Sequence, residues 1–170
     1  MVESVTDLFS GGADSDTNAI DLLTADHRKV QELFSQVRKD EEANGPRLFP
    51  EIRRELEIHT HIEEQVFYPH LLKVGDEKLQ SITQEALVEH RQAKALLDQL
   101  FEQRDDRDRF AAELKVLMED VEHHVDEEEN EMFPLVRGQL DDGMLVRLGA
   151  LMEAEKKRFS EGTSRAASAR

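Results

Sequence analysis

The chain of 170 residues contains no cysteine, no tryptophan and a single tyrosine. Without cysteine it cannot form disulfides, thiolate metal sites or a cysteine nucleophile. Any metal ion must therefore be bound by imidazole and carboxylate groups. Those ligands suit iron, manganese or zinc better than copper(I).

Long hydrophobic segments are also missing. The N-terminal segment has no basic region and no apolar run of signal-peptide length. No stretch approaches the roughly 20 apolar residues that a membrane-spanning helix needs. We therefore expect a cytoplasmic protein that makes no contact with a membrane. We also expect a monomer or a weak homo-oligomer.

Positive charge is scarce, because 22 Lys and Arg residues stand against 38 Asp and Glu residues, for a formal net charge of −16. Such a surface repels phosphate backbones, so no nucleic-acid partner is expected. Charged residues make up 35% of the chain and aromatic residues 5%. This composition is typical of a helical protein with a narrow apolar seam and a wide polar surface.

Apolar residues recur at helical spacing through most of the chain, which predicts an all-α fold. The first helix is expected to begin at Thr17 or Asn18, either of which could cap it. It is expected to end where Asn44-Gly45-Pro46 breaks the pattern. The second helix should end near Gly75, with Pro69 inside it as a point where it can kink.

Two more long helices and a shorter one follow. The third is expected to stop in the charged stretch 103–109, the fourth to end near Pro134, and a shorter fifth helix to follow Gly143. Short connections place neighbouring helices antiparallel, so we expect an up-down-up-down four-helix bundle with a short additional C-terminal helix. The expected organisation is a flexible leader at 1–17, the bundle at 18–138, the C-terminal helix at 139–160 and a flexible tail at 161–170.

Each of the four long helices carries a histidine within its apolar stripe, and two of them carry a glutamate one turn later. These core-facing residues are His27, His59, Glu63, His90, His124 and Glu128. A single core histidine is more often a hydrogen-bonded core residue than a ligand, but four at matching depths are not well explained that way. Unpaired carboxylates in a core cost several kcal/mol, and Lys94 is the only cationic side chain on these stripes. A pair of divalent or trivalent cations is therefore the expected compensation.

The two halves of the chain repeat one pattern: an acidic-His-Arg triplet, and then His-x-x-x-Glu-Glu followed by an aromatic residue and proline. The paired segments are 26–28 with 89–91, and 59–69 with 124–134. Because His at i and Glu at i+4 share a helix face, we expect two helical hairpins related by a pseudo-twofold axis around a symmetric dinuclear site. In that site His27 and His59 serve one metal ion, His90 and His124 serve the other, and Glu63 and Glu128 bridge both.

Other polar residues next to these positions are expected to play smaller parts. His61 and His123 face away from the stripe and are interpreted as surface residues or as outer partners of ligands. Glu64 and Glu129 are interpreted as exposed helix charges. Tyr68 is expected to be a core aromatic residue, although near an oxidising iron it could donate an electron or a hydrogen bond.

These motifs resemble the hemerythrin family, specifically the bacterial hemerythrin-like proteins with the HHE cation-binding domain, over roughly residues 18–138. The resemblance implies a four-helix bundle with a non-haem di-iron centre, whose two iron ions are bridged by an oxo or hydroxo group. Members of the family bind oxygen, sense it, handle iron, or reduce peroxide and nitric oxide. The small-molecule partners that the resemblance implies are oxygen, hydrogen peroxide and nitric oxide.

The sequence departs from the oxygen-carrying hemerythrins at two positions. Those proteins have a second histidine one turn after the third-helix ligand, where this chain has Lys94, and they use Asp where this chain has Glu128. Two histidines per metal leave open or water-filled positions, which favours redox chemistry over reversible oxygen carriage. The simpler interpretation of Lys94 is that its charge reaches solvent. The alternative is a buried, neutral amine that hydrogen-bonds a bound oxygen species.

The sequence supports two main functional hypotheses. The first is a di-iron enzyme or scavenger that acts on hydrogen peroxide, nitric oxide or oxygen. The alternative is a non-catalytic oxygen- or iron-binding module for storage or sensing. A ferritin-like protein is disfavoured because those proteins use Glu-x-x-His rather than His-x-x-x-Glu. A zinc hydrolase is disfavoured because its metal has three protein ligands and one open position.

Overall fold

The computed structural model describes residues 17–168, with side chains placed through residue 162. This part of the chain is helical and contains no strand, as the all-α prediction expected. All but the last residue of the expected leader at 1–17 lies outside the described residues. The elements are α1 (Ala19–Lys39), α2 (Glu41–Ile62), the π-helical turn η1 (Glu63–Phe67), α3 (Tyr68–Val74), α4 (Glu77–Glu102), α5 (Arg107–Glu127), the π-helical turn η2 (Glu128–Met132), α6 (Phe133–Gln139) and α7 (Asp142–Ser168).

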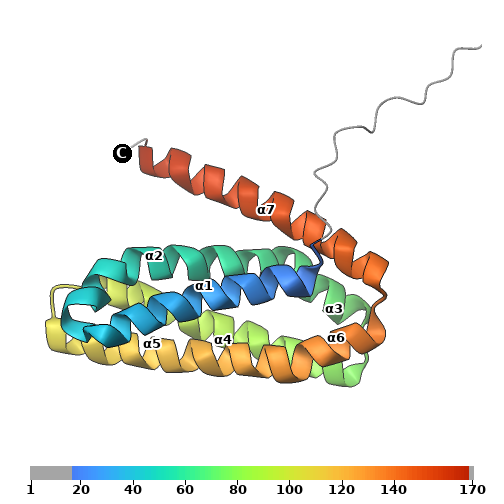
Figure 1. The fold of residues 1–170 in the computed structure, drawn as a ribbon, viewed down its shortest axis with the longest axis horizontal. Coiled ribbons are helices and arrows are strands. Elements are labelled where there is room, and N and C mark those ends of the chain that lie inside the picture. The colour runs from blue at the N-terminus through green and yellow to red at the C-terminus, as the bar shows by residue number, and fades with distance from the viewer. Residues whose placement is uncertain (1–16, 169–170) are drawn as a thin grey trace, which may run out of the picture.

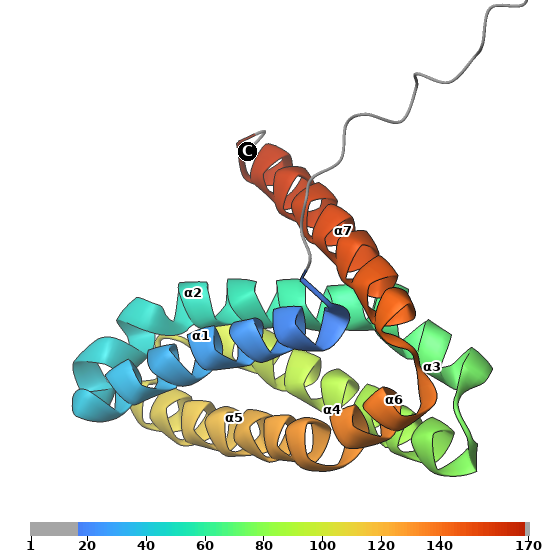
Figure 2. The same cartoon turned by 45° about the vertical axis from the view of Figure 1, so that its right-hand side comes forward.

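The long helices α1, α2, α4 and α5 lie side by side along the length of the molecule, and α3 and α6 continue α2 and α5 (Figure 1, Figure 2). The main packing partners are α1 with α2 and α4 with α5. Helix α7 crosses this arrangement on one side, where it packs on α1, α2 and η1. None of the described helices is long and apolar enough to cross a membrane.

Side-chain caps explain where four helices begin. Each capping side chain accepts a hydrogen bond from the backbone N–H three residues ahead, which satisfies one of the donors that a helix start leaves unpaired. Of the two expected caps of the first helix, Asn18 has this role. The four caps are Asn18 for α1, Asp40 for α2, Asp76 for α4 and Asp106 for α5.

The break expected at Asn44-Gly45-Pro46 is wrong, because the chain turns at Asp40 and these residues lie inside α2. Asn44 supports the turn, since its side chain donates a 2.8 Å hydrogen bond to the carbonyl of Gln36 in α1. Gly45 allows a close approach of α5: a Cβ at this position would lie 3.1 Å from Leu114. Proline is tolerated near a helix start, where few intrahelical hydrogen bonds are lost.

The C-terminal helix is longer than expected. Its expected range was 139–160 with a flexible tail beyond, whereas α7 runs from Asp142 to Ser168, so residues 161–168 are helical. Residues 169–170 lie outside the described part. Several contacts hold α7 against the rest of the described chain. Among them, Phe159 stacks on His61 with ring centroids 4.1 Å apart, and the backbone of Gly149 packs so closely on the carbonyl of Thr17 that a Cβ at this position would clash with it.

Two apolar clusters fill the interior on either side of a polar layer. One cluster gathers residues of α1, η1, α3 and α6 around Tyr68 and includes Leu145, Leu148 and Met152 of α7. The other cluster joins α1, α2, α4 and α5 around Phe34, Ile52 and Leu117. The polar residues predicted from the apolar stripes lie between these clusters, so they are shielded from water at both ends.

Candidate metal centre

The structure brings the six core-facing polar residues together in one buried cluster, called here the inner cluster. None of its members is more than 8% exposed. Their rings pair as the repeat predicted, with centroids 4.9 Å apart in each pair. The members of the inner cluster are His27 of α1, His59 of α2, Glu63 of η1, His90 of α4, His124 of α5 and Glu128 of η2.

Each glutamate of the inner cluster contacts one histidine from each pair. An oxygen of Glu63 lies 3.2 Å from the Nε2 atoms of both His59 and His90. An oxygen of Glu128 lies 3.1 Å from Nε2 of His27 and 3.6 Å from Nε2 of His124. The two carboxylates are therefore the groups that join one histidine pair to the other.

Several atoms at the centre of this cluster are buried without a hydrogen-bond partner among the described residues. They are Nε2 of His27, Nε2 of His59, both oxygens of Glu63 and one oxygen of Glu128. Buried polar atoms without partners are rare and costly, so each needs an explanation, and a bound ion is one of those that apply. Potential ligand atoms gather here in two groups, each within 4.8 Å: His27, His59, Glu63 and Glu128, and Glu63, His90 and His124. The donor set of imidazole and carboxylate fits metal cations.

The Nδ1 atom of every histidine in the inner cluster faces an acidic side chain. These four side chains, called here the outer carboxylates, are Asp26, Glu64, Glu89 and Glu129. Nδ1 is 2.8 Å from Glu129 for His27, 3.0 Å from Glu64 for His90, and 2.7 Å from Glu89 for His124. For His59 the distance to Asp26 is 3.8 Å, an ion-pair separation rather than a hydrogen bond. A proton on Nδ1 leaves the Nε2 lone pair directed to the centre, as metal-binding histidines require.

The outer carboxylates stand next to members of the inner cluster in the sequence but serve other members. Asp26 precedes His27 and faces His59, while Glu64 follows Glu63 and accepts from His90. The expectation that Glu64 and Glu129 are exposed helix charges is therefore wrong, since their side chains are only 23% and 22% exposed and contact the buried His90 and His27. The sequence pattern did not predict these contacts, because each of them joins residues on two different helices.

Three of the outer carboxylates also contact a cation. Arg28 donates to Glu129 at 2.7 Å, Lys156 of α7 donates to Asp26, and Lys94 donates to both oxygens of Glu64 at 2.7 Å. The Lys94 side chain is 41% exposed, which agrees with the interpretation that its charge reaches solvent. The hydrogen bond from His90, followed by the contact with Lys94, lowers the pKa of Glu64 to about 2.

Burial and mutual repulsion set the protonation of the inner cluster in the metal-free protein. Burial lowers the pKa of His59 to about 4, so this imidazole is neutral at pH 7 and able to bind a cation. Burial and the nearby charge of Glu128 raise the pKa of Glu63 well above its ordinary value. Burial also opposes ionisation of Glu128, but His124 and His27 outweigh it and lower its pKa. Burial and repulsion between the two carboxyls thus oppose ionisation of Glu63, and a cation at the same place would favour it.

Tyr68 lies within the site and contacts its polar residues, in addition to being the core aromatic residue that the sequence predicted. It is fully buried, donates a 2.7 Å hydrogen bond to Glu128 and lies 3.3 Å from Nε2 of His90. The equivalent position in the second half holds Phe133, whose ring stacks parallel to His27 at 5.9 Å. A phenol oxygen therefore lies among the donor atoms near His90 and is absent at the equivalent place near His27.

A π-helical turn begins at each glutamate of the inner cluster. η1 starts at Glu63 and η2 starts at Glu128, and each is followed by a proline in the first turn of the next α-helix. Proline lacks the N–H that an α-helix would need, so Pro69 and Pro134 favour a local change of hydrogen bonding just before them. π-turns occur frequently at functional sites because they redirect side chains.

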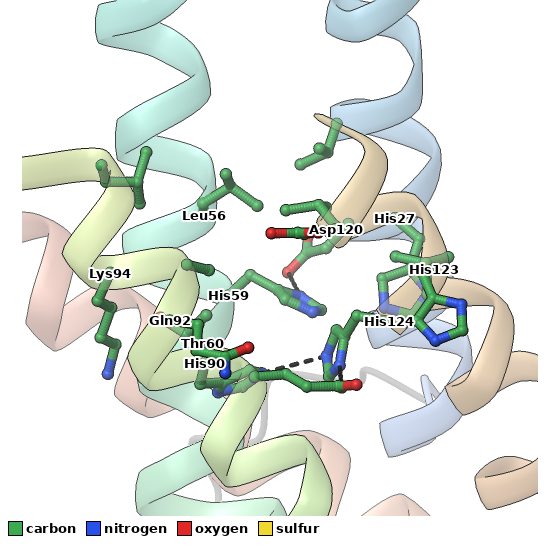
Figure 3. A pocket seen from close by; sticks show the side chains of 17 residues that line it. His27, Leu56, His59, Thr60, His90, Gln92, Lys94, Asp120, His123 and His124 are labelled. Carbon is green, nitrogen blue, oxygen red and sulfur yellow. Dashed lines mark hydrogen bonds and ion pairs between the residues drawn. The ribbon is translucent and has the colours of Figure 1, made fainter. Parts of the chain in front are cut away.

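A cavity of about 130 Å³ reaches the histidines of the inner cluster. Its walls are largely apolar and include Val30, Leu56 and Leu97. Figure 3 shows His27, His59, His90 and His124 converging from their separate helices at this cavity. Of the other histidines in the two repeats, His61 pairs with Glu155 of α7 at 2.7 Å, and His123 is 68% exposed.

The helical fold and the buried His/Glu cluster define a helical protein with a site that could hold metal. Comparison with known proteins agrees: the chain belongs to the hemerythrin family, because residues 18–136 match the Hemerythrin HHE cation binding domain. This match confirms the resemblance drawn from the sequence motifs.

Two curated relatives have modest identity to the chain. A DNA nickase from Nostoc sp. (strain PCC 7120) is 27% identical over 155 residues, which is 89% of this chain and 42% of that protein. An uncharacterized hemerythrin-like protein of Schizosaccharomyces pombe is 26% identical over 142 residues, 83% of this chain and 70% of that protein. The chain thus spans less than half the length of the nickase. No solved structure matches it.

Proposed function

We propose that this chain is a di-iron protein, in which an antiparallel up-down-up-down four-helix bundle binds two iron ions between its two apolar clusters. The observation that carries the proposal is the inner cluster itself: six buried imidazole and carboxylate side chains with unpartnered atoms at their centre. The ligands would be His27, His59, Glu63, His90, His124 and Glu128.

The geometry supports a division of labour among these six residues. The pair His27 and His59 would bind one iron, and the pair His90 and His124 would bind the other, because each pair meets edge to face. Glu63 and Glu128 would bridge, because each contacts a histidine of both pairs. The outer carboxylates would fix the orientation of the imidazoles and increase their basicity.

We further propose that the protein reacts with small oxygen or nitrogen species: hydrogen peroxide, nitric oxide or oxygen. A pair of irons supplies redox equivalents and Lewis acidity at one place when bound. The chain restricts what can reach them, because the cavity of about 130 Å³ has apolar walls and admits only small molecules. Tyr68 holds a proton on a hydrogen bond to Glu128, and burial with the nearby glutamates raises its pKa well above the ordinary value.

An alternative is a non-catalytic module that stores or senses iron or oxygen with the same six residues. Both hypotheses require the metal. They differ in whether the protein catalyses a reaction of the small molecule or only binds it. DNA is not part of the proposal, although one relative is named a DNA nickase, because the formal net charge of −16 opposes binding of a polyanion.

The test begins with iron-saturated protein and elemental analysis, for which two irons per chain are expected. Peroxide loss and oxygen evolution are then followed, with the metal-free protein and free iron at equal concentration as controls. Decomposition of peroxide by the loaded protein alone supports the enzyme hypothesis. Two irons with untouched peroxide and reversible oxygen binding would favour the storage or sensing module, and one metal or none would refute both.

A further inference from the structure

Glu89 differs from the other outer carboxylates in its surroundings. Glu129, Glu64 and Asp26 each contact Arg28, Lys94 or Lys156. Among the described residues no lysine or arginine forms an ion pair with Glu89. Its pKa is lowered by His124 instead, and burial opposes that effect. Lysine or arginine therefore neutralises three of the outer carboxylates, whereas Glu89 has no such partner among the described residues.

Glu89 faces two further potential ligands on α5, His123 and Glu127. Potential ligand atoms of these three residues lie within 4.8 Å of one another, and Nε2 of His123 is 3.3 Å from Glu127. The His123 side chain is 68% exposed, and Glu127 and Glu89 are 28% and 24% exposed. We call these three residues the surface cluster. It combines one imidazole with two carboxylates, a donor set suited to iron(II), manganese or zinc.

The repeat explains why this cluster exists in one half of the chain only. The positions equivalent to His123 and Glu127 in the first half are Ile58 and Ile62, which are 5% and 0% exposed. Ile62 packs in the apolar cluster that includes Leu148 of α7. Helix α7 packs on α1, α2 and η1, so the first half needs apolar side chains here, whereas the second half has polar ones that reach solvent.

Two of the three residues of the surface cluster also line the cavity that reaches the inner cluster. Glu89 and His123 line this cavity together with Asp120, and so do His27 and His59. Nε2 of His27 and Nε2 of His59 are buried and have no hydrogen-bond partner among the described residues. Figure 3 shows His123 beside His124 on α5, with Asp120 nearby on the same helix. One cavity is thus lined both by the solvent-exposed His123 and by buried histidines of the inner cluster.

We propose that Glu89, His123 and Glu127 form a surface site for a divalent cation, from which iron(II) is loaded into the inner cluster. This inference rests on the proposed function, because it supplies the metal that the function needs. One oxygen of Glu89 accepts from Nδ1 of His124 at 2.7 Å. The Glu89 carboxyl also lies within hydrogen-bonding reach of Glu127, so two acidic side chains meet at the surface where a cation could bind between them. Glu89 therefore contacts a histidine of the inner cluster while it binds the incoming ion.

The first experiment looks for the site itself by adding Mn²⁺ to protein already saturated with iron and following the free Mn²⁺ signal by electron paramagnetic resonance. Wild-type protein is expected to bind one further ion per chain. His123→Asn and Glu127→Gln are expected to weaken that binding by about tenfold or more, the upper range for loss of groups around a metal being about 100-fold. Glu131→Gln is the matched control, because Glu131 is exposed on the neighbouring turn and the substitution changes the net charge equally.

The second experiment measures loading by mixing metal-free protein with ferrous iron under anaerobic conditions. Glu127→Gln is expected to slow uptake by about tenfold, the lower range of electrostatic effects on association, and to reach the same final iron content. Equal behaviour of Glu127→Gln and Glu131→Gln in either experiment would overturn the inference. The iron content of wild-type protein reports on the proposed function, whereas the difference between these two variants reports on the surface site alone.

Discussion

Replacing Glu129 with alanine removes an outer carboxylate and leaves all six proposed ligands in place. Glu129 lies 2.8 Å from Nδ1 of His27, and its side chain is 22% exposed, so the lost hydrogen bond is partly shielded from water. Without it, His27 loses both the restraint on its ring and the acceptor that keeps its proton on Nδ1. Loss of such a partner typically weakens metal binding about 10–100-fold, equivalent to about 1.4–2.8 kcal/mol.

A chelator competition assay measures this effect, with the wild type and each variant loaded with iron and titrated against the same chelator. Glu64→Ala, the equivalent change in the first half, is expected to weaken iron binding at His90 by a similar factor. Glu131→Ala serves as the control, because Glu131 is exposed two residues beyond Glu129. If Glu129→Ala retained iron as firmly as Glu131→Ala, the role given to the outer carboxylates would be refuted.

Three further predictions concern the inner cluster and its iron. Glu63→Ala is expected to lose both irons at saturating iron, because Glu63 contacts both histidine pairs. Arg28→Ala is expected to retain both irons, because the ion pair of Arg28 with Glu129 is exposed and worth about 1 kcal/mol or less. Elemental analysis of the two variants separates these outcomes. Tyr68→Phe removes the 2.7 Å hydrogen bond to Glu128 and is expected to leave the iron content at two, because the phenol keeps its proton and is not one of the six proposed ligands. Loss of iron from this variant in elemental analysis would contradict that assignment. Removal of iron is expected to lower the unfolding temperature, since a ligand at about 100 times its dissociation constant stabilises the folded state by about 2.7 kcal/mol; equal melting curves with and without iron would contradict binding to the folded core.

Helical periodicity was sufficient to predict the fold class and the buried positions, because each stripe reports which face of a helix avoids water. Helix boundaries were harder. Asn44, Gly45 and Pro46 usually end helices, yet here they lie in α2 because Asp40 caps that helix and Gly45 lets Leu114 pack closely. Local propensity states only which backbone conformation each residue type favours, and tertiary contacts can override that preference.

The internal repeat made the inner cluster predictable, because His27 with His90 and Glu63 with Glu128 occupy equivalent positions and are buried as expected. The outer carboxylates were not predictable in the same way. Glu129 and His27 are 102 positions apart, and their contact depends on how α1 packs against η2. A sequence stripe shows which residues face inward, but it does not show which partner on another helix they meet.

Residues that are not shared by the two repeats give the two histidine pairs of the inner cluster different neighbours. Tyr68 brings a hydroxyl to His90 and Glu128, where the equivalent Phe133 brings only a stacked ring to His27. The surface cluster at His123 is likewise found only in the second half, because α7 packs on the first half. The hydroxyl of Tyr68, which contacts His90, and the surface cluster, whose Glu89 contacts His124, therefore both lie beside the same histidine pair. The two histidine pairs therefore have different surroundings, and the two metal positions that we propose would be inequivalent although their ligands are related by the repeat.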